Sequence, residues 1–198
     1  MNRAEIKNRA RCILDPLVVA LAGLGVPPTL VTLIGTAIAL YGASLIIDGS
    51  FPAAGALLLV AGLCDVLDGD LARRRGTTSE FGAFIDSTLD RVVEFAYYGG
   101  IILYLVERSG GFHNFDVAVT LTALTSSVLT SYTRARAEGL GVECRVGILE
   151  RPERIALLAL GLFLGYRVLM ALLTAIAVAA TVSFLQRIYH VHHELRRR

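Results

Sequence analysis

The chain has 198 residues, 55% of them hydrophobic, and a formal net charge of only +2. Its mean hydropathy is positive, which excludes an ordinary soluble enzyme and predicts a single membrane domain over residues 1–198. We divide this domain into a juxtamembrane segment (1–26), a six-helix transmembrane core (27–190) and a basic cytoplasmic tail (191–198), and we expect no nucleic-acid partner.

The juxtamembrane segment is basic over residues 1–11, and the apolar stretch that follows, residues 14–24, is interrupted by Asp15 and Pro16. This interruption argues against a cleaved signal peptide. Residues 4–24 instead predict an amphipathic helix lying on the membrane surface. A plain tether would fit the same residues.

Six hydrophobic segments follow, and turn-forming residues separate them, for example at Pro27-Pro28 and at Asp48-Gly49-Ser50. A hydrocarbon core of about 30 Å needs roughly 20 helical residues, so the run that ends at residue 64 must continue toward Arg73. We therefore predict an all-α integral membrane protein with six transmembrane helices. The segments are residues 30–47, 51–64, 81–106, 117–133, 152–167 and 168–186.

The basic residues indicate an orientation. With six spans both termini lie on one side, and that side holds 17 of the 19 Lys and Arg residues, all but Arg108 and Arg167. The positive-inside rule then predicts a multi-pass protein of the cell membrane, with both termini facing the cytoplasm.

Four aspartates interrupt the apolar stretches, Asp65 and Asp68 in one and Asp86 and Asp90 in the next. The spacings i, i+3 and i, i+4 place each pair on one face of a helix. Two such faces turned toward each other would supply up to four carboxylates, the hard oxygen ligands that Mg²⁺, Mn²⁺ or Ca²⁺ favours. A structural ion-pair lattice with nearby arginines is the alternative, but charged groups inside a membrane are costly and usually functional.

The full pattern over residues 65–90, D-x2-D-G-x2-A-R-x8-G-x3-D-x3-D, resembles the signature of the CDP-alcohol phosphatidyltransferases, with every fixed position filled. The resemblance implies a membrane enzyme, typically homodimeric, that moves a phosphatidyl group from a CDP-linked lipid to an alcohol and releases CMP. It implies Mg²⁺ as cofactor, with Mn²⁺ as an alternative. It also implies that Asp65, Asp68 and Asp86 are metal ligands, and that Asp90 accepts the proton of the attacking hydroxyl while also touching a metal.

The same resemblance assigns binding of the donor, CDP-diacylglycerol or CDP-archaeol, to a further group of residues. Gly69 would let the cytidine approach the backbone, and Arg73 would meet the pyrophosphate. A Pro-Pro pair before a helix is equally often only a helix start. The implied donor-binding residues are Pro28, Thr29, Leu30, Val31, Gly69, Arg73 and Ser79.

Arginines at predicted helix ends indicate an anionic acceptor, because a guanidinium can hold a phosphate through two hydrogen bonds. Pro152 would stand at the first helical position, so that the positive helix end points toward the cytoplasm. Residues 131–138, 150–154 and 186–187 resemble the branch of the family that uses inositol 1-phosphate. The candidates are Arg134, Arg136, Arg151, Arg154 and Arg187. Topology signals or lipid headgroup contacts are the alternative for each.

Two alternative functions are a transferase with a different acceptor and a transporter. Glycerol 3-phosphate, which yields phosphatidylglycerophosphate, would also need a phosphate site, whereas serine and free inositol would not. A cation or proton transporter would use the carboxylates for conduction, but it would need a polar route to a far side that carries almost no charge. For the expected dimer, the small residues Ser126, Ser127 and Thr130 would allow close helix contact.

Overall fold

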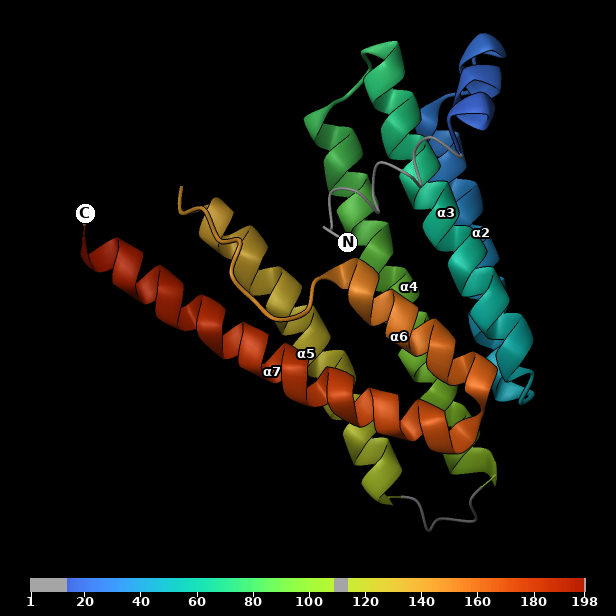
Figure 1. Cartoon of the computed structure of the whole chain (residues 1–198), viewed down its shortest axis with the longest axis vertical. Coiled ribbons are helices and arrows are strands. Elements are labelled where there is room, and N and C mark those ends of the chain that lie inside the picture. Colours follow the sequence, from blue (N-terminus) through green and yellow to red (C-terminus); the bar gives the residue numbers. More distant parts are fainter. Residues whose placement is uncertain (1–13, 109–113, 198) are drawn as a thin grey trace.

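The structure is a computed structural model that describes residues 14–108 and 114–197. A short helix, Leu14–Gly23, opens the described part, and longer helices follow it (Figure 1). These are α2 (Pro28–Ile47), α3 (Phe51–Arg75), α4 (Glu80–Arg108), α5 (Asn114–Glu138), α6 (Arg151–Leu164) and α7 (Tyr166–Arg196). The predicted all-α class is confirmed for the described residues. The juxtamembrane helix is present from residue 14 on, and residues 4–13 of that prediction lie outside the described residues.

The helix ends follow local residue chemistry. A proline stands in the first turn of α2, α3 and α6, where its missing N–H costs nothing. Helix α3 ends at Gly76, whose φ of 63° is the left-handed conformation that glycine adopts most easily. The Gly76 N–H returns to the carbonyls of Ala72 and Arg73. This cap ends α3 after the first aspartate pair, and the chain then returns as α4, which packs with α3 against α2.

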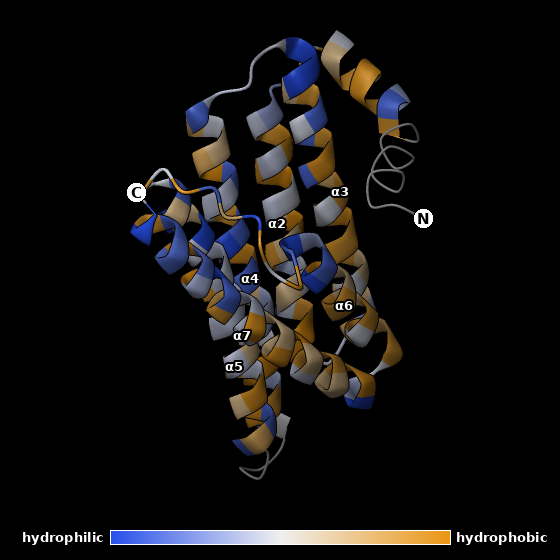
Figure 2. Cartoon of the chain, turned by 60° about the vertical axis from the view of Figure 1, so that its left-hand side comes forward, coloured by the Kyte–Doolittle hydropathy of each residue, from blue (hydrophilic) through white to orange (hydrophobic). Residues whose placement is uncertain are grey.

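Three of the described helices, α2, α3 and α7, are long and apolar enough to cross a membrane. The protein therefore has the character of a membrane protein. Helix α6 has 14 residues, or about 21 Å at 1.5 Å per residue, which is shorter than a hydrocarbon core of about 30 Å. The number of six spans stays a prediction. Figure 2 shows hydrophilic residues gathered at the end of α3 and at the start of α6.

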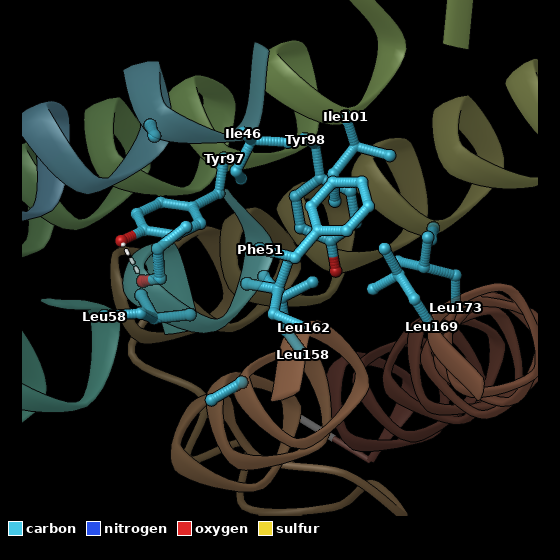
Figure 3. Packing of buried hydrophobic residues seen from close by; sticks show 14 of the residues in the cluster. Ile46, Phe51, Leu58, Tyr97, Tyr98, Ile101, Leu158, Leu162, Leu169 and Leu173 are labelled. Carbon is cyan, nitrogen blue, oxygen red and sulfur yellow. Dashed lines mark hydrogen bonds between the residues drawn. The ribbon is translucent and has the colours of Figure 1, made fainter. Parts of the chain in front are cut away.

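The helices α2 to α7 pack in a closed order in which each packs mainly against two others: α2, α3, α6, α7, α5, α4 and back to α2 (Figure 1). The apolar core lies inside this ring, around Tyr97 and Tyr98 of α4 and Leu158 and Leu162 of α6 (Figure 3). The Tyr97 hydroxyl donates a hydrogen bond of 2.9 Å to the carbonyl of Ala54 in α3. The core thus joins α3 and α4, which follow each other in the chain, to α6 and α7, which come much later in the sequence.

Helices α2 and α4 approach closely at two glycines. A Cβ at Gly100 would lie 2.7 Å from the Ala43 carbonyl oxygen, and one at Gly42 would lie 2.2 Å from the Tyr97 hydroxyl. Neither distance is possible for a side chain, so the close contact of the two helices requires glycine at both positions.

The small residues of α5 serve packing within the chain. Ser126, Ser127 and Thr130 are buried, and the Thr130 hydroxyl lies 2.9 Å from the carbonyl of Ala180 in α7. These residues were expected to allow helix contact in a dimer, whereas in the structure their close contact is within the chain, between α5 and α7.

Candidate functional site

The two aspartate pairs meet where α3 faces α4. One carboxylate oxygen from each of Asp65, Asp86 and Asp90 lies within 4.8 Å of the others, and all three residues are partly buried. The helical spacing predicted this convergence, and the cap at Gly76 makes it possible. Three converging carboxylates are a ligand set suited to a hard divalent cation such as Mg²⁺ or Mn²⁺.

The fourth aspartate, Asp68, lies apart from that group. It is only 7% exposed, and its Oδ2 accepts a hydrogen bond of 2.6 Å from the Thr32 hydroxyl in α2. A buried carboxylate needs such a donor. Thr32 was not among the predicted site residues, although it lies one turn beyond Pro28, next to the stretch assigned to the donor.

Arg151, the first residue of α6, contacts the carboxylates from a third helix. Its guanidinium forms an ion pair with Asp90 and lies 3.5 Å from Asp65 Oδ1. A cavity of about 40 Å³ is lined by these groups, and we call it the carboxylate cavity. Among its lining residues are Thr32, Asp65, Asp68, Asp86, Asp90 and Arg151.

A larger cavity of about 450 Å³ opens beside the carboxylates, between the start of α2, the end of α3 and the start of α4. We call it the Arg73 cavity. The Arg73 side chain is about half exposed and pairs with Asp70, and it lies 3.4 Å from the place of a Cβ on Gly69. The lining includes Pro28, Thr29, Asp68, Gly69, Arg73, Ser79 and Asp86.

The structure thus brings together five of the seven residues predicted to bind the donor. The other two belong to different surroundings because successive helical residues point in different directions. Leu30 is exposed, and Val31 is buried in a cluster with Leu67 and Leu71.

A third cavity, of about 160 Å³, lies where α5, α6 and α7 meet, and we call it the arginine cavity. Two of its arginines, Arg154 and Arg187, are almost fully buried. Arg187 donates from Nε to the carbonyl of Val146 at 2.8 Å and from Nη1 to the carbonyl of Thr130. The lining consists of Ser131, Arg134, Ala135, Glu138, Glu150, Arg151, Arg154 and Arg187.

Four of the five predicted arginines therefore share one cavity. Ser131, Arg134 and Glu138 follow the i, i+3, i+7 spacing of one helical face, and Arg134 pairs with Glu138 at 2.9 Å. Arg136 lies two residues beyond Arg134, on another face of α5, and is exposed. The prediction that placed Arg136 with the other four is not matched by the geometry.

Comparison with known proteins gives a family match over most of the chain. The family model for CDP-alcohol phosphatidyltransferase matches residues 25–185. The archaetidylinositol phosphate synthase of Methanothermobacter thermautotrophicus is 37% identical over 190 residues, which are 94% of this chain and 92% of that protein. The phosphatidylinositol phosphate synthase of Streptomyces avermitilis is 38% identical over 210 residues, 98% of this chain and 85% of that protein.

Solved structures of a phosphatidylinositol phosphate synthase are also similar to this chain. The crystal structure of Mycobacterium tuberculosis phosphatidylinositol phosphate synthase with CDP-DAG bound is similar, with a TM-score of 0.83 and 31% identity over 90% of this chain and 93% of that chain. The structure of the same enzyme in complex with manganese and citrate gives a TM-score of 0.80 and 32% identity over 89% of this chain and 87% of that one.

Proposed function

This chain belongs to the CDP-alcohol phosphatidyltransferase family, and we propose that it transfers a phosphatidyl or archaetidyl group from a CDP-linked lipid to inositol 1-phosphate, releasing CMP. It is an enzyme by family membership. The acceptor is supported by the two relatives, both synthases of inositol phosphate lipids. The glycerol 3-phosphate alternative remains a rival for the same phosphate site.

One observation carries the proposal: the carboxylate cavity adjoins both larger cavities. Asp68 and Asp86 line the Arg73 cavity as well as the carboxylate cavity, and Arg151 lines the arginine cavity as well as the carboxylate cavity. A donor in the first cavity and an acceptor in the second would therefore meet at the aspartates. This is the arrangement that direct transfer between two bound substrates requires.

The Arg73 cavity fits the nucleotide part of the donor. We propose that Gly69 lets the cytidine approach the α3 backbone, and that Arg73 exchanges Asp70 for the pyrophosphate, a more highly charged partner. Pro28 and Thr29 on α2 and Ser79 before α4 complete the wall. The exposed apolar faces of the helices are suited to the lipid tails and to membrane lipids.

The carboxylates fit a divalent cation, because three oxygens already converge and Asp68 lines the same cavity. We propose Mg²⁺, with Mn²⁺ as an alternative, held by Asp65, Asp68, Asp86 and Asp90. Such a cation supplies positive charge that screens the aspartates and polarises the phosphate under attack. Asp90 would accept the proton of the acceptor hydroxyl. Its ion pair with Arg151 places that carboxylate at the side of the arginine cavity, from which the hydroxyl would arrive.

The arginine cavity fits the acceptor phosphate. Arg151 and Arg154 approach it from α6, Arg134 from α5 and Arg187 from α7, so that guanidinium groups from three helices surround a small volume. A phosphate dianion can accept several charge-assisted hydrogen bonds there. Free inositol is uncharged, and the single carboxylate of serine stands beside an ammonium group, so neither accounts for a set of arginines as a phosphate dianion does.

We also propose the cell membrane as the location, with the site and both termini on the cytoplasmic side, because Lys and Arg gather there in the six-span arrangement. A homodimer is proposed on the resemblance to the family. Its interface would use exposed apolar helix faces, since the small residues of α5 are buried within the chain.

The test is a panel of acceptors. Purified protein with CDP-lipid and Mg²⁺ receives inositol 1-phosphate, glycerol 3-phosphate, serine or inositol, and CMP release is measured with diacyl and archaeol donors. We expect CMP release with inositol 1-phosphate alone. Release with glycerol 3-phosphate and none with inositol 1-phosphate would overturn the proposed acceptor.

A further inference from the structure

Arg154 is held in an unusual way for a residue that is expected to bind a ligand. It is 3% exposed, and a guanidinium at that depth is costly unless it is paired and hydrogen-bonded. Its Nη2 donates to the Ser131 hydroxyl at 3.3 Å and lies 3.6 Å from Glu94 Oε1. Its Nε has no hydrogen-bond partner among the described residues. The side chain is thus supported at one end and keeps an unused buried donor.

Glu94 of α4 is the charged part of that support, and Arg154 shares it with a second arginine. Its Oε2 forms an ion pair with Arg91, whereas its Oε1 faces Arg154. One carboxylate thus faces two guanidinium groups. The lining of the arginine cavity holds four arginines and two glutamates, which leaves positive charge in excess there. Glu94 is 11% exposed and lies outside the lining of the arginine cavity, so any effect it has on an acceptor is indirect, through the side chains that it contacts.

Ser131 of α5 is the neutral part of the support. Its hydroxyl donates to the carbonyl of Ser127 at 3.3 Å, and it accepts from Arg91 at 2.9 Å and from Arg154 at 3.3 Å. A hydroxyl has one donor and two acceptor positions, and here all three are used. Ser131 therefore has one preferred orientation, which fixes both guanidinium groups relative to α5.

We propose that Glu94 is a positioning residue for acceptor recognition: together with Arg91 and Ser131 it holds Arg154 so that its Nε and the excess positive charge serve the phosphate of the acceptor. This inference rests on the proposed function, which places a phosphate in the arginine cavity. The excess charge calls for an anion and the unused Nε calls for an oxygen acceptor, and a phosphate supplies both. Selection of phosphorylated over unphosphorylated polyols then depends on a residue of the same helix that carries Asp86 and Asp90.

The experiment compares Glu94→Gln with Glu107→Gln, the same substitution on an exposed residue near the far end of α4. Apparent KM values for inositol 1-phosphate and for CDP-lipid are measured in detergent, and binding of inositol 1-phosphate is followed by calorimetry. Loss of the carboxylate that pairs with Arg154 predicts that Glu94→Gln raises the acceptor KM and Kd about 10-fold or more, with less than about a 2-fold change for CDP-lipid. Glu107→Gln should match the wild type.

Three results would overturn the proposal: an unchanged acceptor KM, an equal rise of both KM values, or an effect of Glu94→Gln that persists in full when Arg154→Ala is already present. If Glu94→Gln does not fold, Glu94→Asp keeps the charge on a shorter side chain. A smaller rise of the acceptor KM alone is then expected, and no rise would overturn the proposal.

The wild type is tested first with both phosphorylated acceptors. Should it use only glycerol 3-phosphate, the proposed acceptor is wrong, and the Glu94 comparison is made with that compound, because the role of Glu94 depends only on a phosphate.

Discussion

Thr32→Val tests whether the α2 hydroxyl prepares Asp68 for the metal. Valine has nearly the shape of threonine and removes the 2.6 Å hydrogen bond to Asp68 Oδ2. Asp68 is 7% exposed, so water cannot readily replace the lost donor. A hydrogen bond to a charged group contributes about 1.5–3 kcal/mol, which corresponds to roughly 10- to 150-fold in an equilibrium constant. Removing a partner of a metal ligand typically weakens metal affinity about 10- to 100-fold.

The assay is CMP release as a function of Mg²⁺ or Mn²⁺ concentration, with both substrates saturating. We expect the metal concentration for half-maximal activity to rise at least about 10-fold, with much of the maximal rate recovered at high metal. Thr122→Val is the matched control, because that exposed hydroxyl donates only to the carbonyl of Ala118 in its own helix. An unchanged metal requirement in folded Thr32→Val would refute the reasoning, because Asp68 would then need no help from α2.

Three further variants test the other parts of the site and its scaffold. Asp90→Asn should still bind CDP-lipid and Mn²⁺ but lose CMP release, since an amide does not accept the hydroxyl proton; loss of nucleotide binding as well would mean that Asp90 acts chiefly as a ligand. Arg73→Ala should raise the KM for CDP-lipid about 10-fold or more and leave the KM for the acceptor within about 2-fold, and the reverse result would place Arg73 with the acceptor. Gly42→Ala should lower the unfolding free energy by about 1–3 kcal/mol, measured by thermal unfolding in detergent, because the added Cβ would lie 2.2 Å from the Tyr97 hydroxyl. Gly99→Ala meets no atom within 4 Å and is the control.

The aspartate group could be predicted from the sequence because its information is local. Spacings of three and four residues fix which side chains share a helical face, and a glycine after Arg75 indicates where the chain turns back. Thr32 could not be found in the same way. A threonine in an apolar helix commonly bonds the carbonyl one turn back, and Thr32 does lie 3.2 Å from the Pro28 carbonyl oxygen. Its second contact joins residues 36 positions apart, which no local pattern encodes.

The arginines could be predicted only in part. Their number and type indicated a phosphate site, and four of them do share a cavity. Nothing in composition distinguishes Arg134 from Arg136, but the helical rotation between them does, because residues two apart face different directions. The number of membrane spans is likewise not fixed by apolar segments alone. An apolar segment of residues 152–167 resembles a span, whereas the helix that forms has 14 residues and ends before Gly165.

The capping of helix α6 bears on how the phosphate of the proposed acceptor would be bound. The sequence predicted that the positive end of this helix points toward the cytoplasm, and in the structure a capping box is present there. The Glu150 side chain accepts from the Glu153 N–H, and the Glu153 side chain accepts from the Glu150 N–H at 2.6 Å. Two N–H groups are thus engaged, and two carboxylates already lie at the positive end of the helix dipole. An acceptor phosphate must therefore depend mainly on guanidinium groups. Arg151 and Arg154 stand one turn apart on this capped turn, the first paired with Asp90 and the second with Glu94. The cap thus fixes the two arginines relative to each other, and each pairs with a carboxylate of α4.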